Sequence, residues 1–338
     1  MRALFKRVMW TAVVFGSILA ASILWWANSP LRLPPGSNSL DLSIEPGTRP
    51  AAIAQAVADA GVQVQPQLLR WWFRLSGQAR NLRAGGYEIQ AGATPVSLTR
   101  MLARGEESLR TLSLIEGWNW QQVRRALAQA SDLKHDAQSM SDQELMQALG
   151  RPGLHPEGQF YPDTYSYAKG SSELALLRRA LHAMDKHLAD AWAQRSAQVA
   201  VQTPSQALVL ASIIEKETGR PQDRAMISSV FNNRLRIGMR LQTDPTVIYG
   251  LGTTFDGNLR KADLLADTPY NTYTRAGLPP TPIAMPGKAA LWAAVQPAAS
   301  KALYFVARGD GSSAFSATLE EHNRAVVQYQ LRAQPASK

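Results

Sequence analysis

The pattern of apolar and polar positions begins with one uninterrupted apolar run. Residues 8–27 contain no charged side chain over about 20 positions, three basic residues precede them, and two tryptophans close the run. A helix of this length spans a hydrocarbon core of roughly 30 Å, whereas the apolar region of a cleaved signal peptide has only about 7–15 residues. Tryptophans favour the membrane interface and basic residues the cytoplasmic side. The pattern predicts a cytoplasmic tail at 1–7, a transmembrane anchor at 8–28, and all later residues outside the cytoplasmic membrane.

The stretch that follows predicts a linker and a small domain. Residues 29–39 are rich in Pro, Gly and Ser, which is typical of a linker. Over 40–106 the pattern alternates with period two from Leu40, takes helical spacing up to Gly61 and again in QLLRWWFRLSG, and then predicts a strand and a last helix. The order strand, helix, helix, strand, helix indicates a small α+β unit.

The remaining residues, 107–333, carry mostly helical patterns. A strand begins near Thr111, and the longest helical pattern is SSELALLRRALHAMDKHLADAWAQ. A hairpin is indicated by ALYFVARGDGSSAFS, and Thr318 with Glu321 predicts a capping box that opens the last helix. The chain as a whole is therefore predicted to be α+β: an N-terminal transmembrane helix, the small unit, and a larger mixed domain with a helical core and a C-terminal β-hairpin.

Charge and composition restrict the classes of molecule that the chain is expected to bind. The chain of 338 residues has a formal net charge of +10 and no cysteine. Three of the positive charges lie in the tail, which leaves +7 for the outer part. A basic outer domain suits anionic lipid headgroups or an acidic cell-wall polymer. Nucleic acid is not expected, because the predicted topology places the domain outside the cytoplasm and no basic stripe with interleaved aromatics occurs.

Familiar catalytic motifs are missing from the sequence. It contains no phosphate-binding glycine loop, no GxSxG and no HExxH. His182 and His187 are five positions apart, which misses the one-face spacing of a metal pair. We therefore predict neither a metal nor a cofactor, and carboxylates remain as the groups available for chemistry.

Two carboxylates occur at the end of the apolar helix PSQALVLASIIEKETG, for which Ser205 is the expected N-cap. Apolar side chains cover nearly its whole circumference, so the helix is predicted to be buried. Burial raises the pKa of a carboxyl, which suits a general acid near neutral pH. The alternative is that Glu215 and Glu217 pair with basic neighbours. The periodicity does not indicate which of the two glutamates is the acid, although it predicts that Glu217 is somewhat more buried.

Two further polar clusters follow this helix. In RLQTDPTVIYG, Asp244 before a proline is explained as an N-cap, but Gln242 and Tyr249 are not. TPYNTYTRAGLPPTPIAMPG is a long Pro/Gly loop that holds Asn271 and Tyr273, and loops of this length are usually functional. Amides, hydroxyls and aromatic rings are the groups that grip a sugar.

These clusters resemble one family over nearly the whole chain, from the apolar run to about Gln330. The runs ASIIEKETGR, VFNNRLRIGMRLQTDPTVIYG, YNTYTRAGLPPTPIAMPG, EGQFYPDTY and LYFVARGDG are similar to those of the YceG-like endolytic murein transglycosylases, also called MltG. The resemblance implies a LysM-like unit at 40–106 and a catalytic transglycosylase domain at 107–333. It also implies cleavage of nascent peptidoglycan at the outer face of the cytoplasmic membrane, which ends strand elongation.

The same resemblance implies the site and its chemistry. It gives Glu215 as the catalytic residue, which protonates the β-1,4 glycosidic oxygen while the C6 hydroxyl of N-acetylmuramic acid attacks C1 to leave a 1,6-anhydro end. One carboxylate then suffices, whereas ordinary glycosidases need two. Glu217 is interpreted as structural. The expected substrate-binding residues are Gln242, Asp244, Tyr249, Asn271 and Tyr273.

A second hypothesis comes from a different class of protein. A membrane-anchored scaffold would hold glycan with its small unit and recruit cell-wall synthases, such as penicillin-binding proteins, with its larger domain. The two hypotheses differ in whether Glu215 performs chemistry.

Overall fold

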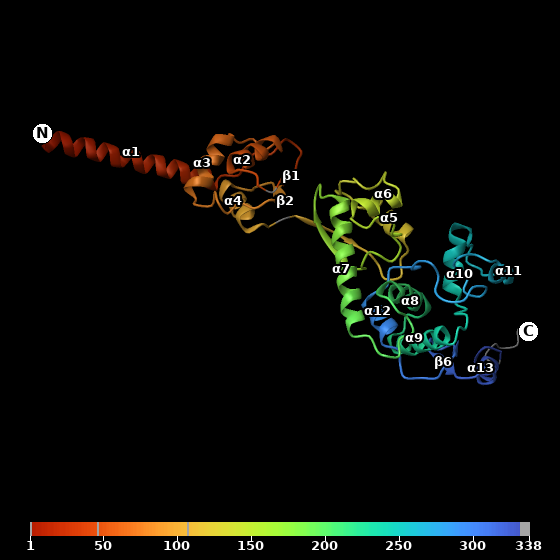
Figure 1. The fold of residues 1–338 in the computed structure, drawn as a ribbon. Coiled ribbons are helices and arrows are strands. Elements are labelled where there is room, and N and C mark those ends of the chain that lie inside the picture. Colours follow the sequence, from red (N-terminus) through yellow and green to blue (C-terminus); the bar gives the residue numbers. More distant parts are fainter. Residues whose placement is uncertain (1, 46, 107, 332–338) are drawn as a thin grey trace, which may run out of the picture. The chain divides into compact units, whose positions relative to one another are not determined.

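The computed structural model describes residues 2–45, 47–106 and 108–331, without the side chains of residues 2–8, 11, 12 and 331. The chain forms two compact units, and each is described by itself. Unit 1 comprises Met1–Thr111, Ser131–Lys134 and Ser166–Ser171, and unit 2 comprises Leu112–Ala130, His135–Tyr165 and Ser172–Lys338. The elements of both units are labelled in Figure 1.

The N-terminal segment is helical. Helix α1 (Arg2–Asn28) covers the segment predicted as the anchor. Within the described part of the chain, no helix combines the length and the apolar character needed to cross a membrane. The predicted cytoplasmic tail begins at Met1, which lies outside the described residues.

Beyond α1, unit 1 has the predicted order of elements. They are β1 (Ser39–Ile44), α2 (Pro50–Asp59), α3 (Pro66–Leu75), β2 (Gly85–Gln90) and α4 (Pro95–Arg104). The strands pair antiparallel in the register Ser39↔Gln90 to Ile44↔Gly85. Leu42, Ile53, Phe73 and Ile89 belong to the buried core between sheet and helices. The likeness of this unit to a LysM domain stays a prediction.

The boundary between the units runs through two strands that pair with each other, β3 (Leu109–Ser113) and β4 (Thr164–Ala168). Unit 2 is otherwise mainly helical. Its helices are α5 (Trp120–Gln129), α6 (Asp142–Ala148), α7 (Glu173–Ala193), α8 (Pro204–Glu217), α9 (Pro221–Arg236), α10 (Asp244–Leu251), η1 (Gly252–Thr254), α11 (Lys261–Leu265), α12 (Lys288–Val295), α13 (Leu319–Val326) and η2 (Val327–Leu331).

The C-terminal part follows the sequence prediction closely. Strands β5 (Tyr304–Ala307) and β6 (Ser313–Ser316) form the predicted antiparallel hairpin. The hydroxyl of Thr318 accepts a hydrogen bond from the Glu321 amide and closes the predicted capping box of α13.

Helix α8 is the centre of unit 2. Its residues 207–214 are all buried, and it packs against α7, α9, α10 and α12, as Figure 1 shows. The all-round apolar pattern therefore predicted its burial correctly. Its N-cap is Thr203, whose hydroxyl accepts from the Gln206 amide, and the prediction of Ser205 was wrong because Pro204 occupies the first helical turn.

Candidate active site

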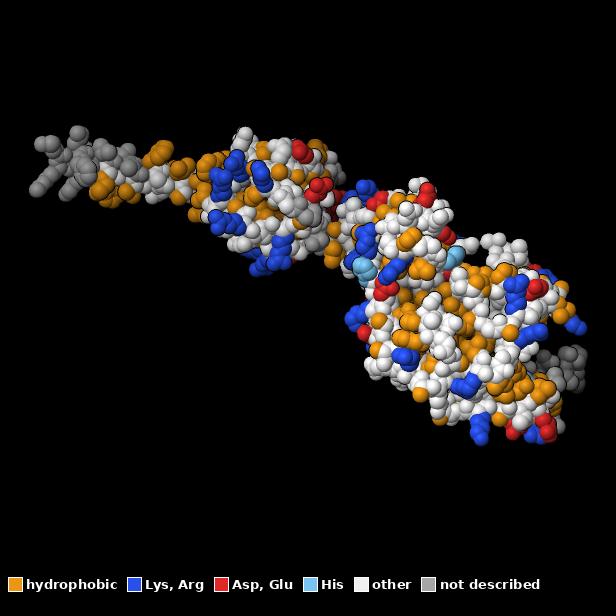
Figure 2. Space-filling view, viewed as in Figure 1, with side chains coloured by type: hydrophobic (Ala, Val, Ile, Leu, Met, Phe, Trp, Pro, Cys, Tyr) orange, Lys and Arg blue, Asp and Glu red, His pale blue; other side chains and the backbone are white. Residues whose placement is uncertain are grey.

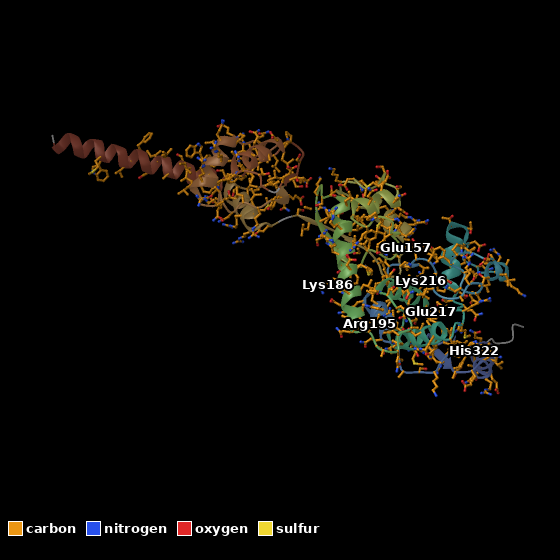
Figure 3. The ribbon with its side chains drawn as sticks, viewed as in Figure 1. Glu157, Lys186, Arg195, Lys216, Glu217 and His322 are labelled. Carbon is orange, nitrogen blue, oxygen red and sulfur yellow. The ribbon has the colours of Figure 1, made fainter. Side chains whose placement is uncertain are left out.

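The C-terminal end of α8 presents three successive polar residues in different directions, because residues on a helix turn by about 100° per position. Figure 3 labels two of them, Lys216 and Glu217. Glu217 lines a cavity of about 370 Å³, whereas Lys216 lines a separate cavity of about 640 Å³. Glu215 belongs to the described lining of neither cavity.

Glu217 is a half-buried residue whose carboxyl borders this polar cavity. The hydroxyl of Thr243 donates a hydrogen bond of 2.7 Å to its Oε2 atom. Burial raises the pKa of Glu217, and the nearby charge of Asp244 adds to the rise, while the Thr243 hydrogen bond and the Arg234 charge oppose it. A carboxyl in this position is suited to hold a proton at a higher pH than a free glutamate.

Three of the five predicted substrate-binding residues share the cavity of Glu217. They are Gln242, Asp244 and Tyr273. Gln242 has a positive φ of 49°, which is uncommon for a residue other than glycine and is concentrated at functional sites. The backbone amide of Gln242 donates a hydrogen bond of 3.1 Å to the Thr272 carbonyl, which connects the segment before α10 to the long Pro/Gly loop.

The carboxylate of Asp244 points across this cavity rather than capping α10. The Tyr273 hydroxyl donates to its Oδ1 atom at 2.6 Å. Asp244 is the first residue of α10, and Thr243 holds the N-cap position without a side-chain capping bond. The interpretation of Asp244 as an N-cap was therefore wrong, and both side chains belong to the cavity wall.

Arg234 supplies the positive charge of the wall. Its guanidinium donates to the carbonyls of Leu303 and Leu241, each at 2.7 Å, and lies 5.3 Å from the ring centre of Tyr304. Burial lowers the pKa of Arg234. Because its hydrogen bonds fix the side chain, this cation sits in a constant place near Glu217.

Glu215 is held on another side of the helix. Its Oε2 accepts a hydrogen bond of 2.9 Å from the Gly287 amide, and its Oε1 lies 3.6 Å from an Arg224 nitrogen. The side chain is 7% exposed. Burial raises its pKa, the Gly287 hydrogen bond lowers it, and the charge of Glu116 raises it. The carboxylate thus ties α8 to the start of α12.

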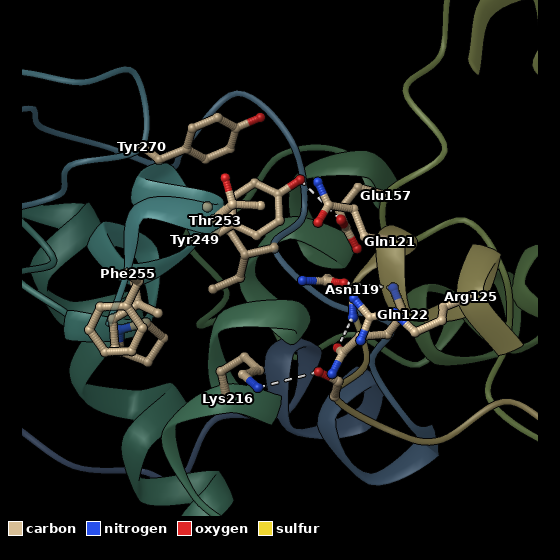
Figure 4. Close-up of a pocket in the computed structure, with 15 residues that line it drawn as sticks. Asn119, Gln121, Gln122, Arg125, Glu157, Lys216, Tyr249, Thr253, Phe255 and Tyr270 are labelled. Carbon is tan, nitrogen blue, oxygen red and sulfur yellow. Dashed lines mark hydrogen bonds between the residues drawn. The ribbon is translucent and has the colours of Figure 1, made fainter. Parts of the chain in front are cut away.

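Tyr249 belongs to the larger cavity, together with a residue to which the sequence assigned no role. Its hydroxyl donates to the Oε2 atom of Glu157 at 3.0 Å, as Figure 4 shows. Both carboxylate oxygens of Glu157 also lie 3.0 Å from the donating Trp120 amide. Glu157 is 2% exposed, and burial raises its pKa to about 7. The signal in the sequence was its place at the head of the aromatic segment EGQFYPDTY.

Asn271 is part of the scaffold beneath the site. It is 0% exposed, and its amide nitrogen donates to the carbonyls of Asp263, Leu264 and Ala266 at 3.2, 3.1 and 2.7 Å. Its side-chain oxygen accepts from the Tyr273 amide at 2.8 Å. Asn271 therefore positions Tyr273, and the oxygen and nitrogen of its side-chain amide are hydrogen-bonded to backbone atoms.

The described residues contain no group of three or more His, Cys, Asp or Glu side chains arranged to hold a metal ion.

Comparison with known proteins identifies the family of this chain. Residues 42–328 match the YceG-like family. The endolytic murein transglycosylase of Bacillus subtilis is 30% identical over 308 residues, which cover 86% of this chain and 85% of the relative. The protein of that name from Streptococcus pneumoniae D39 is 27% identical over 333 residues, 88% of this chain and 60% of that longer relative.

A solved structure gives the same result. A YceG-like protein from Listeria monocytogenes, known from a crystal structure, aligns with a TM-score of 0.54 and 32% identity over 85% of this chain and 98% of its own. With a family match over most of its length and relatives that agree in sequence and in fold, this chain belongs to the YceG-like family.

Proposed function

We propose that the chain is a lytic transglycosylase of peptidoglycan. Its relatives in Bacillus subtilis and Streptococcus pneumoniae are named endolytic murein transglycosylases, which supports this activity. The observation that carries the proposal is the setting of Glu217: a half-buried carboxyl whose pKa is raised, at the edge of a cavity lined by polar and aromatic side chains.

The proposed reaction needs one acid and no water. Protonated Glu217 donates its proton to the β-1,4 glycosidic oxygen between N-acetylmuramic acid and N-acetylglucosamine, and the bond from that oxygen to C1 breaks. The C6 hydroxyl oxygen of the same muramic residue bonds to C1, and its proton passes to the Glu217 carboxylate. The acid is regenerated, and the strand ends in a 1,6-anhydro sugar.

The resemblance in sequence gives Glu215 for this role, whereas the geometry favours Glu217. Glu217 shares its cavity with Gln242 and Tyr273, and its one hydrogen-bonded oxygen leaves the other available. Glu215 is engaged on both oxygens, by the Gly287 amide and the Arg224 guanidinium. We therefore propose Glu217 as the acid and keep Glu215 as the alternative.

A digest of purified peptidoglycan by the full chain in detergent tests the activity. Mass spectrometry of the fragments should show anhydro-ended products, whereas hydrolysis would give fragments heavier by one water. Absence of any cleavage over a range of pH would leave the scaffold hypothesis, in which the chain binds glycan and recruits synthases without chemistry.

Matched variants assign the acid. Glu217→Gln should lower the rate by roughly 10²–10⁴-fold, the range for loss of a general acid, and Glu215→Gln should stay within about tenfold of the parent. Thermal unfolding of both variants verifies that they fold. The reverse pattern would transfer the role to Glu215 and leave the activity itself unaffected.

We further propose that α1 anchors the chain in the cytoplasmic membrane, with the N-terminus in the cytoplasm and unit 2 on the outer side. The basic residues before the apolar run and the tryptophans after it support this orientation. A short linker would then favour nascent strands near the membrane, where cleavage ends elongation and a penicillin-binding synthase is the expected partner. A reporter fused after Lys338 should be active only outside the cytoplasm, and cytoplasmic activity would refute the orientation.

A further inference from the structure

Helix α3 of unit 1 exposes a stripe of large apolar side chains. Leu68, Trp71 and Leu75 are 47%, 60% and 67% exposed. Their spacing of three and four residues places them on one face of the helix. The opposite face is already used, because Leu69 and Phe73 are fully buried in the core of unit 1. Single exposed apolar residues need no explanation, but a contiguous stripe of three indicates an interaction surface.

The surroundings of the stripe are positively charged. Arg70 and Arg74 on the same helix are exposed, and the Arg74 guanidinium lies 5.7 Å from the ring centre of Trp71. Neither arginine forms an ion pair with another described residue. Residues 63–105 contain six arginines and a single acidic residue, Glu88. A partner of this surface should therefore be apolar at its centre and anionic around it.

A groove between α3 and α4 borders the stripe. It has a volume of about 300 Å³, and Trp72, Thr99, Arg100 and Arg104 are among the residues that line it. Both arginines are exposed, and as residues i and i+4 they lie on one face of α4, where Arg104 also forms an exposed ion pair with Glu106 at 3.4 Å. Guanidinium groups in such an arrangement match phosphate oxygens well. The groove adds a place for an anionic headgroup beside the apolar stripe.

The stripe lies at the end of unit 1 that α1 joins. Helices α1 and α3 both pack against α4, and the Leu31 amide just after α1 donates to the Ala93 carbonyl at 2.7 Å. In Figure 2, hydrophobic and basic side chains lie together at this end of unit 1. The neighbouring end of α1 carries exposed apolar side chains of its own, among them Leu24 and Trp25.

We propose that this surface of α3 and α4 binds an anionic lipid bilayer, with Leu68, Trp71 and Leu75 inserted at the boundary of headgroups and acyl chains and the arginines on lipid phosphates. Apolar insertion combined with basic flanks is the usual design of an interfacial helix. A glycan strand fits the surface less well, because two of the three side chains of the stripe, Leu68 and Leu75, can neither form hydrogen bonds with a sugar nor stack on it. This inference does not depend on the proposed catalysis.

The absence of cysteine from the chain allows a direct test. Single Leu75→Cys and Ser43→Cys variants of the full chain are labelled with an environment-sensitive fluorophore and reconstituted into two kinds of vesicle, phosphatidylcholine alone or mixed with phosphatidylglycerol. Ser43 is an exposed residue of β1, which Figure 1 shows at the other end of unit 1 from α1. It is the matched control position.

The label at residue 75 should show a blue-shifted emission and quenching by spin-labelled lipids in the phosphatidylglycerol vesicles, and high salt should weaken both effects. The label at residue 43 should report water in every case. Arg70→Glu together with Arg74→Glu should lower the quenching at residue 75 by about tenfold at low salt. Both residues are exposed, so an unchanged unfolding temperature verifies the fold.

Three outcomes would overturn the proposal. A label at residue 75 that stays as solvated as the one at residue 43 excludes insertion. A response to purified glycan strands without lipid would identify glycan as the partner. A response that appears without lipid and grows with protein concentration would identify a second copy of the chain.

Discussion

The Thr243 hydroxyl donates a hydrogen bond of 2.7 Å to the Glu217 carboxylate. Such a bond stabilises the ionised form and so lowers the pKa of Glu217, against the larger effect of burial. The same threonine is fixed by its own backbone, since its amide donates to the Thr272 hydroxyl at 3.1 Å. The segment before α10 and the long Pro/Gly loop thereby hold in place the hydrogen bond that lowers the pKa of Glu217.

Removal of this hydrogen bond should shift the pH dependence of activity. In Thr243→Val the carboxylate loses a donor, the pKa of Glu217 rises further, and the acid stays protonated to a higher pH. The alkaline limb of kcat/KM should therefore move to higher pH. Rates of anhydro-product formation measured across the pH range would detect the shift.

Thr253→Val is the control for this measurement, because Thr253 lines the larger cavity instead. It should leave the alkaline limb in place. A Thr243→Val profile that superimposes on that of the parent would show that Glu217 does not set this limb.

Asn271 should prove to be a residue of stability. Its amide nitrogen donates to three carbonyls in a fully buried position. Asn271→Ala leaves those acceptors unpaired, and with about 1 kcal/mol for each lost bond the free energy of unfolding should fall by about 3 kcal/mol. Chemical denaturation measures this loss.

The exposed Asn258 offers a comparison for Asn271. Asn258→Ala should change stability by no more than about 0.5 kcal/mol, as is usual at the surface. If Asn271→Ala were as stable as Asn258→Ala but bound glycan poorly, Asn271 would contact substrate after all.

The sequence was most informative where one local pattern decides the structure. The all-round apolar pattern of α8 predicted its burial, and Thr318 with Glu321 predicted the start of α13, because both depend on residues close together in the chain. The site was less predictable. Periodicity cannot tell that Thr243 meets Glu217 while Gly287 meets Glu215, since these contacts depend on how distant loops pack.

Residue type was also an incomplete guide to role. Asn271 has the chemistry of a sugar ligand, yet its hydrogen bonds go to the backbone. Glu157 lies 92 positions before Tyr249, and only the tertiary fold brings the two together in the larger cavity.

Gly158 should tolerate no side chain. Its φ is +76°, and an added Cβ would lie 2.4 Å from the Cβ of Pro282. Gly158→Ala combines left-handed backbone strain with a steric clash, so it should lose about 3 kcal/mol of unfolding free energy or more. Gly170 has nearly the same φ, +77°, with open space around it. Gly170→Ala should lose only about 1–2 kcal/mol, and equal losses in denaturation would show that the clash is relieved without cost.

Glu157 should make the folded chain less stable as pH rises. Its pKa is raised to about 7 by burial, from 4.5 for a free glutamate. Between these values the folded chain keeps a proton that the unfolded chain has released, so stability is highest below the lower value and is lost as pH increases through the higher one. From pH 5 to pH 8 this contribution falls by about 2.5 kcal/mol. Glu157→Gln keeps an acceptor for the Trp120 amide and carries no titrating proton.

Unfolding free energies of the parent and of Glu157→Gln at several pH values should therefore converge as the pH falls and separate as it rises, with the variant relatively more stable at pH 8. Glu144 provides a contrast of opposite sign, because hydrogen bonds from Ser141 lower its pKa. The ionised Glu144 carboxylate stabilises the fold, and this stabilisation is lost as the pH falls. Glu144→Gln should therefore lower the free energy of unfolding at neutral pH and not at acidic pH. Parallel curves for the parent and Glu157→Gln would mean that Glu157 titrates alike in the folded and unfolded chain.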